Sequence, residues 1–265
     1  NGIQEPVIGV AFDGTGYGDD GRIWGGEFLV ADFRGFERKG HLEYVPMPGG
    51  DAAVVRPYRM AIGYLYTLLG EDTLNRKLDF LKEVDESEIK VLTQQVEKNI
   101  NSPLTSSCGR LFDAVSALVG IRGRIDYEAQ AAVELEMAAA DGFGDVETYP
   151  YAILKQDGVR IVKLGDLFKA IILDMERGLG ASEISLRFHH TVARMVSRMC
   201  RLISDETCIN MVALSGGVFQ NRLLSRLTTA ALKKEGFTVL THSMVPTNDG
   251  GISLGQATVA NFTST

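Results

Sequence analysis

Ile209-Asn210-Met211-Val212-Ala213-Leu214-Ser215-Gly216-Gly217-Val218-Phe219-Gln220-Asn221 is the stretch that decides the fold class. It begins as an apolar run typical of a buried strand and then passes through two glycines. Beyond it, the sequence predicts a helix over 221–235, a strand over 238–240 and a final helix over 251–262. Because alternating strands and helices build parallel sheets, this part of the chain is expected to be α/β.

The rest of the chain is predicted to place a helical region between two β-containing regions. Strands are predicted over 7–12, 23–33 and 41–45, with a glycine-rich turn over 13–21. The apolar spacing then becomes helical, and the segments with this spacing lie over 52–69, 87–100, 107–119 and 127–140. Strands over 151–154 and 159–162 and helices over 164–179 and 182–203 lead into the α/β segment.

The composition is that of an ordinary globular protein. The 265 residues are 45% hydrophobic and carry a net charge of −7, which disfavours a duplex nucleic-acid groove. No apolar run is long enough to span a bilayer, so we expect a cytoplasmic protein without a membrane partner. The three cysteines form no C-x-x-C pair and are expected to be reduced.

A first candidate site lies in Phe12-Asp13-Gly14-Thr15-Gly16, where the first predicted strand ends. The glycines would let backbone N–H groups approach a phosphate, and Asp13 could hold a cation that bridges phosphates. The alternative is a plain glycine-rich hairpin. The spacing is not that of a dinucleotide-binding motif, because a strand follows it rather than a helix.

A second candidate is the turn through Gly216 and Gly217 into the helix that starts near Asn221. This arrangement puts backbone donors and the positive end of a helix at the carboxyl edge of a sheet, where α/β proteins bind nucleotides. Asn221 would reach a ribose or base, and the alternative is a tight structural turn. In the later segment 246–256, Asp249 would either cap the last helix or join Asp13 on a metal.

A third candidate is Ser106-Ser107-Cys108-Gly109-Arg110-Leu111-Phe112-Asp113, in which Ser106 or Ser107 is a helix N-cap. Gly109 and Asp113 lie one helical turn apart and would admit and bind a ribose edge, unless Asp113 simply faces solvent. Cys108 is interpreted as a small core residue rather than a nucleophile. His189-His190 is not expected to bind a metal, because neighbouring helical residues point about 100° apart.

Six motifs in this order carry a family resemblance: 12–16, 24–27, 48–51, 106–113, 215–221 and 249–256. Together they resemble the C-terminal half of the HypF-type carbamoyltransferases of nickel–iron hydrogenase maturation, and more distantly the TsaD family. The resemblance covers essentially the whole chain. It implies a two-lobed actin/Hsp70/sugar-kinase-like fold with a helical insertion: about 1–50 as the β portion of the first lobe, 51–150 mainly helical, and 151–265 as a second α/β lobe.

The resemblance also implies a reaction. An upstream YrdC-like domain of the same parent chain makes carbamoyl-adenylate from carbamoyl phosphate and ATP, and this domain passes the carbamoyl group to the C-terminal cysteine of the partner HypE. The acceptor thiolate is therefore expected to come from HypE. Excluding water from the cleft would protect the labile adenylate.

By matching motifs, the resemblance implies nucleotide contacts at Gly109, Asp113, Gly216, Gly217 and Asn221, and a phosphate loop at Gly14, Thr15 and Gly16. It implies a divalent metal, zinc, iron or magnesium, on Asp13 and Asp249. The family's remaining metal ligands are histidines that lie shortly upstream of the first strand, and nothing precedes Asn1 here. We therefore expect an excised C-terminal fragment with weak metal binding.

Two other functions are consistent with the same features. One is a small-molecule kinase of the same superfamily, which would need a catalytic base positioned against a substrate hydroxyl. The other is a non-catalytic module that docks HypE and merely retains the fold.

Overall fold

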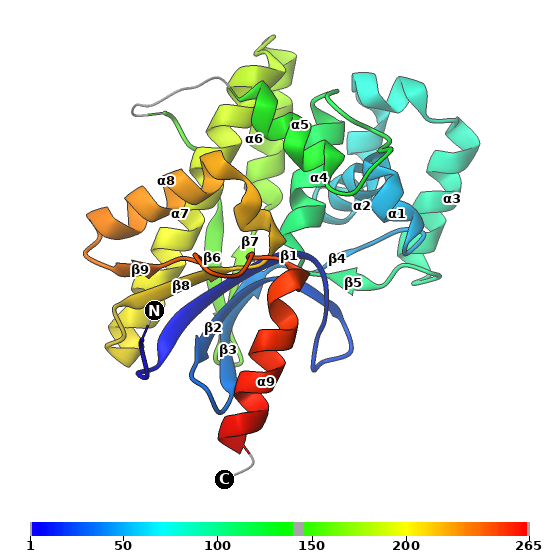
Figure 1. Ribbon diagram of the computed structural model, residues 1–265. Helices are drawn as coiled ribbons and strands as arrows, with labels where there is room; N and C mark the ends of the chain where they lie inside the picture. Colours follow the sequence, from blue (N-terminus) through cyan, green and yellow to red (C-terminus); the bar gives the residue numbers. More distant parts are fainter. Residues whose placement is uncertain (1, 140–145, 264–265) are drawn as a thin grey trace.

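The structure is a computed structural model that describes residues 2–139 and 146–263. Helices gather in the upper part of the view in Figure 1, over a strongly twisted sheet, and α9 (Ile252–Thr263) extends downward away from them. No helix in the described ranges is long and apolar enough to cross a membrane.

One mixed sheet runs through the described part of the chain, in the order β6-β7-β3-β2-β1-β8-β9, with β4 and β5 attached beside β2. Strands β1, β2 and β3 are antiparallel neighbours, whereas β1, β8 and β9 are parallel to one another. The strands are β1 Val7–Tyr17, β2 Ile23–Ala31, β3 Phe36–Leu42, β4 Val45–Pro46, β5 Leu104–Thr105, β6 Ala152–Gln156, β7 Val159–Lys163, β8 Met211–Ser215 and β9 Thr238–Leu240.

The two ends of the chain therefore share one sheet. Strand β1 pairs in parallel with β8, with Ile8 opposite Val212 and Ala11 opposite Ser215. These hydrogen bonds join the predicted first-lobe β portion over 1–50 to the predicted second α/β lobe over 151–265, and the division into two lobes stays a prediction. The α/β class is confirmed, and so is the helical insertion, which lies between β4 and β6.

The helices pack in two groups. Helices α4 and α7 contact the sheet at β1, while α2 and α5 pack on α4, and α8 packs on α7. The helices are α1 Ala52–Val55, α2 Pro57–Leu69, α3 Glu86–Glu97, α4 Cys108–Leu118, α5 Gln130–Ala138, α6 Gly165–Glu176, α7 Ala181–Thr207, α8 Arg222–Lys234 and α9 Ile252–Thr263. The last residue of the helix predicted over 127–140 lies outside the described residues.

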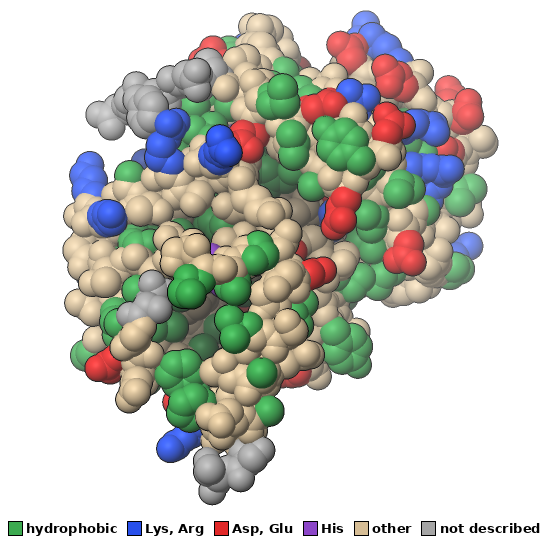
Figure 2. Space-filling view, viewed as in Figure 1, with side chains coloured by type: hydrophobic (Ala, Val, Ile, Leu, Met, Phe, Trp, Pro, Cys, Tyr) green, Lys and Arg blue, Asp and Glu red, His purple; other side chains and the backbone are tan. Residues whose placement is uncertain are grey.

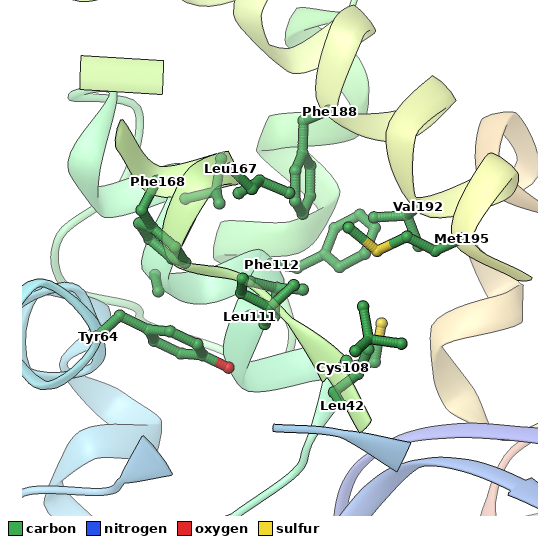
Figure 3. Close-up of a cluster of buried hydrophobic side chains, with 14 of the residues drawn as sticks. Leu42, Tyr64, Cys108, Leu111, Phe112, Leu167, Phe168, Phe188, Val192 and Met195 are labelled. Carbon is green, nitrogen blue, oxygen red and sulfur yellow. The ribbon is translucent and has the colours of Figure 1, made fainter. Parts of the chain in front are cut away.

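A continuous core fills the space between the sheet and these helices. In Figure 3, Phe112 of α4 meets Phe188 of α7, and Tyr64 of α2 stacks on Phe168 of α6. The ring centroids of both pairs are 4.9 Å apart, a separation at which aromatic pairs attract beyond simple area burial. Every residue of α4 is buried, because α2, α5 and the sheet pack around this helix.

Three predicted elements differ from the observed ones. The chain expected to turn at Asp13 stays in β1 as far as Tyr17, with an irregular register between Phe12 and Gly16. The third strand covers 36–42 rather than 41–45. The helix predicted over 52–69 is broken at Arg56, because the proline that follows disfavours helical geometry at the residue before it.

Helix α9 differs from the other long helices because none of its described residues is buried. Hydrophobic side chains can be seen along it in the lower part of Figure 2. The exposed large apolar residues of α9 are Ile252, Leu254, Val259 and Phe262. Phe262 stacks on Phe33, with ring centroids 4.7 Å apart, and this contact links the helix to the end of β2.

Candidate functional site

The carboxyl ends of the parallel strands β1 and β8 bring two predicted motifs together. Gly216 has a φ of 98°, and a Cβ placed there would lie 2.0 Å from the carbonyl oxygen of Phe12. Only glycine allows this approach of the two backbones. A Cβ on Gly217 would lie 3.2 Å from Oδ1 of Asp13, so the Asp13 carboxylate and the glycine turn face each other.

The loop before α9 completes this edge of the sheet. The Gly216 N–H donates to the Thr247 carbonyl at 3.0 Å, which fixes the loop against the turn after β8. Asn248, not Asp249, is the residue that caps the short helix here, because its side chain accepts the Gly250 N–H at 3.2 Å. Asp249 is the first residue of this short helix, and its expected roles as the cap of α9 or as a metal ligand stay predictions.

Helix α4 approaches Asp13 from the other side. Ser107 is its N-cap: the hydroxyl accepts the Arg110 N–H at 3.1 Å and donates to the Asp13 carbonyl at 2.8 Å. A Cβ on Gly109 would lie 3.0 Å from Cα of Gly14. Gly109 thus lets the helix pack directly against the β1 backbone, and its proposed contact with a ribose stays a prediction.

The predicted phosphate-loop residues Gly14, Thr15 and Gly16 belong to the last part of β1. Gly16 pairs with Trp24 of β2, and both Thr15 and Gly16 are exposed. The segment is therefore an irregular strand edge rather than a free loop. Gly14 alone among the three is placed next to α4, with its Cβ position 3.4 Å from Nη2 of Arg110.

Glu27 is a site residue whose role the sequence did not reveal. Its buried carboxylate accepts the Gly25 and Gly26 N–H groups at 2.5 and 2.7 Å, the Ser106 hydroxyl at 2.5 Å and Arg38 Nη2 at 2.8 Å. Burial raises the pKa of this carboxyl, and these hydrogen bonds oppose the shift.

The two glycines whose N–H groups donate to Glu27 pack closely against Asp13 and Ser106. A Cβ on Gly25 would lie 2.6 Å from the Asp13 carbonyl, and a Cβ on Gly26 would lie 2.2 Å from the Ser106 carbonyl. The motif Trp24-Gly25-Gly26-Glu27 therefore clamps β2 against both Asp13 and the start of α4. The sequence showed the two glycines of this motif, but two partners of the Glu27 carboxylate, Arg38 and Ser106, come from segments distant in sequence.

Asn221 is held from two directions. Its Oδ1 accepts the Leu224 N–H at 2.8 Å as the N-cap of α8, and its Nδ2 donates to Nε2 of His189 at 2.9 Å. Nδ1 of His189 in turn donates to the Ser185 carbonyl at 2.8 Å. Burial lowers the pKa of His189 to about 4, which keeps the ring neutral and able to accept from Asn221.

The His189 contact was missed because it depends on the packing of α7 against α8, which no local pattern shows. Both polar atoms of the Asn221 amide have partners inside the protein, so a contact from Asn221 to a ribose or base would use its remaining N–H or its second acceptor site. That contact stays a prediction.

Asp113 does not face solvent. Its exposed fraction is 2%, and Oδ2 lies 3.1 Å from Nη1 of Arg110 one turn earlier on α4. Burial raises the pKa of Asp113 to about 6, and the neighbouring Arg110 opposes this shift. The alternative of a solvent-facing carboxylate is therefore wrong.

A metal site would need more ligands than these strands supply. No group of three or more His, Cys, Asp or Glu side chains that could hold a metal occurs within residues 2–139 and 146–263. Asp13 and Asp249 alone are two carboxylates, and the described residues do not make a complete set of ligands. We therefore derive no chemical step from a metal.

The fold and this glycine-lined edge define the class of protein. Residues 9–256 match the family model described as "Carbamoyltransferase, Kae1-like Domain, second subdomain". The chain is thus a Kae1-like α/β domain, and it belongs to the family of HypF carbamoyltransferases.

Its relatives show the same family. The probable carbamoyltransferase HypF of Methanocaldococcus jannaschii is 35% identical, over 97% of this chain and 33% of that protein. The carbamoyltransferase HypF homolog of Cupriavidus necator is 36% identical, over 97% of this chain and 66% of that protein. The chain therefore spans about a third of the length of the first of these relatives and about two thirds of the second.

Two solved structures share the fold. The crystal structure of full-length HypF in the phosphate- and nucleotide-bound form has a TM-score of 0.91 at 43% identity, and the match covers 98% of this chain and 33% of that one. The crystal structure of T. kodakarensis HypF has a TM-score of 0.83 at 32% identity, covering 97% of this chain and 34% of that one.

Proposed function

We propose that this chain binds the adenylate portion of carbamoyl-adenylate, formed from ATP, where β1, β8 and α4 meet, and that the carbamoyl group passes from there to an external cysteine thiolate. The observation that carries this proposal is the approach of Gly216 and Gly217 to Phe12 and Asp13 at the ends of parallel strands. Such edges are where open α/β sheets bind nucleotides. A solved relative that is 43% identical is described as nucleotide-bound.

In the proposed reaction, the thiolate sulfur attacks the carbamoyl carbon and a C–S bond forms. The bond between that carbon and the adenylate phosphate oxygen breaks, and AMP leaves with the electron pair. The chain's contribution is to hold the adenylate in a fixed orientation, through backbone groups that Glu27 and Ser107 lock in place.

The three cysteines of the chain are poorly placed to be the acceptor: Cys108 and Cys200 are buried, and the exposed Cys208 precedes the amino end of β8, whereas the proposed site is at its carboxyl end. Cys108 lies at the start of α4 but is fully buried, and burial raises the pKa of its thiol well above the usual value. Cys200 is also buried with a raised pKa. Because the thiolate is the reactive form, neither is a suitable nucleophile.

The proposed acceptor is the C-terminal cysteine of HypE in nickel–iron hydrogenase maturation, and the proposed source of carbamoyl-adenylate is a YrdC-like domain of the parent chain. Membership in the HypF family is what supports both proposals. A free acceptor thiolate fits a cytoplasmic setting, where thiols stay reduced. The proposal includes neither a nucleic-acid nor a membrane partner.

The test is the affinity for ADP, measured by calorimetry on the wild-type chain and on Gly217→Ala. The added methyl group would lie between Asp13 Oδ1 at 3.2 Å and Asn248 Cβ at 3.8 Å, so it fills the proposed site without a forbidden φ. We expect the affinity to fall about tenfold or more, a loss of roughly 1.4 kcal/mol.

The matched control is Gly9→Ala, a glycine of β1 that precedes Asp13 by four residues. Its methyl group would meet Leu29 at ordinary contact distances of 3.7 and 3.9 Å, away from the strand ends. ADP affinity should stay unchanged in this variant. Equal ADP affinity in Gly217→Ala and the wild type would rule out the proposed location, and a wild-type chain that binds no ADP would rule out the proposed function.

A further inference from the structure

Arg38 connects a cluster of side chains at the surface to the candidate site. Strand β3 has one extra residue opposite β2, because Phe28 pairs with Gly40 but the next residue of β2, Leu29, pairs with Arg38. Such a bulge redirects side chains and is common beside active sites. Nη2 of Arg38 donates to Oε1 of Glu27 at 2.8 Å, so the side chain at the bulge reaches the buried carboxylate.

The guanidinium of Arg38 is held from several sides. Nη1 donates to the Tyr44 hydroxyl at 2.8 Å and lies 3.4 Å from Oδ2 of Asp20. Cζ lies 4.0 Å from the ring centroid of Trp24, which is a cation–π contact. Asp20 in turn accepts the Trp24 indole N–H at 2.8 Å and the Tyr44 hydroxyl at 2.6 Å. The loop between β1 and β2, which carries Asp20, therefore helps to fix the guanidinium.

The Glu27 carboxylate transmits this arrangement to the site. Besides Arg38, it accepts the N–H groups of Gly25 and Gly26. A Cβ on Gly25 would lie 2.6 Å from the Asp13 carbonyl oxygen, so the backbone of β2 is in direct contact with the end of the first regular part of β1. A displacement of Glu27 would free both glycines and change where Asp13 lies.

The arrangement is a poor way to gain stability. The Glu27 and Arg38 side chains are only 3% and 13% exposed, and removing two charges from water costs about as much as their attraction returns. Nε of Arg38 is buried and has no hydrogen-bond partner among the residues that the structure describes, which adds to the cost. An ion pair of this kind is better explained by the geometry that it imposes on its neighbours.

We propose that Arg38 is a positioning residue for the nucleotide site: it holds Glu27 and thereby fixes Gly25, Gly26 and Asp13 before the ligand arrives. The inference rests on the proposed function and adds residues that do not touch the ligand. A site that is ordered in advance spends less of its binding free energy on ordering. Arg38, Tyr44 and the β1–β2 loop therefore set the affinity of a site that they do not contact.

The experiment measures ADP affinity by calorimetry on the wild type, Arg38→Met and Arg38→Lys. Arg38→Met should lose about tenfold, because Glu27 no longer has the partner that orients it. Arg38→Lys should recover part of the loss, since an ammonium pairs with Glu27 but does not supply the fork that also reaches Tyr44. Tyr44→Phe keeps the ring and removes only the hydroxyl; it should show a smaller loss, and it decides the question if Arg38→Met does not fold.

A second measurement separates positioning from a general loss of stability. Amide hydrogen exchange followed by NMR should accelerate at Gly25 and Gly26 in the Arg38 variants, because their hydrogen bonds to Glu27 loosen. The amides of the buried helix α4 should keep their wild-type rates. If Arg38 only stabilises the fold, exchange should accelerate in α4 as well, and the folded protein should bind ADP normally.

The matched control is Arg160→Met, another strand arginine, which is 7% exposed and donates to Glu206 at 3.0 Å. It lies on β7, and its ADP affinity should equal that of the wild type. Normal ADP affinity in folded Arg38→Met or in Tyr44→Phe, or an equal loss in Arg160→Met, would overturn the inference and leave the nucleotide site standing. A wild type that binds no ADP would overturn the proposed function, and this inference with it.

Discussion

The buried histidine that supports Asn221 should make the stability of the protein depend on pH in a specific way. His189 is fully buried, and its pKa in the folded protein is about 4, against an ordinary value of 6.5. At pH 7 the ring is neutral in both the folded and the unfolded chain. As the pH falls through 6.5, the unfolded chain takes up a proton that the folded protein refuses until about pH 4, so the free energy of unfolding falls over this window.

The size of the effect follows from the pKa difference. At 1.36 kcal/mol for each pKa unit, His189 accounts for a loss of about 3 kcal/mol by pH 4, of which about 2 kcal/mol falls between pH 7 and pH 5. Asp113 acts in the opposite direction, because its raised pKa favours the folded state as the pH falls through about 6. A comparison of variants cancels this second contribution.

The assay is urea unfolding of the wild type and of His189→Gln at several pH values from 7 to 5. The variant will be less stable at pH 7 because it loses ring packing. Its free energy of unfolding should nevertheless fall about 2 kcal/mol less than that of the wild type over this range. His242→Gln, at an exposed position, is the control and should follow the wild type. Parallel curves for His189→Gln and the wild type would refute the assignment of this titration to His189.

Gly216→Ala should destabilise the fold by at least about 3 kcal/mol, because it combines a strained positive φ with a clash against the Phe12 carbonyl; urea unfolding would measure this, and a loss below 1 kcal/mol would contradict it. Ser107→Ala should cost about 1–2 kcal/mol through loss of the α4 cap and of the bond to Asp13, and a thermal shift of that size checks it. Glu27→Gln should cost about 2 kcal/mol, since a neutral amide loses the charge-assisted bonds to Arg38 and to the Gly25 and Gly26 N–H groups, while Asp20 remains beside Arg38; an unchanged urea midpoint would show that the carboxylate is dispensable.

The sequence predicted the elements better than their assembly. Periodicity located the helices of the insertion and the strand before Gly216, because both signals are local. It ended the first strand at Asp13, since glycines favour turns, whereas β1 continues through Gly14 and Gly16 with its pairing to β2 maintained beyond the irregularity. Pairing with β2, which continues as far as Gly16 and Tyr17, outweighed the local turn preference of the glycines.

For the candidate site too, the sequence indicated the residues with a local signature but not the contacts between distant elements. The glycines and Asp13 were found because glycine spacing at strand ends has a local signature. The residues that hold them, Glu27 and His189, were not found, because each acts on partners from other elements. Asp113 was singled out as a ribose contact, which stays a prediction, and only the structure shows that it is buried and paired with Arg110.

The position of β1 in the sheet has a consequence for how the protein is made. Strand β1 is synthesised before strands β2 to β9, yet one of its two edges pairs with a strand that lies about 200 residues later in the chain. Until that strand is synthesised, the edge from Ile8 to Ala11 has backbone groups without their native partners, a state that promotes association with other chains. The same junction that forms the candidate site therefore closes only after β2 to β7 have been synthesised, and until then the open edge of β1 depends on protection from other chains.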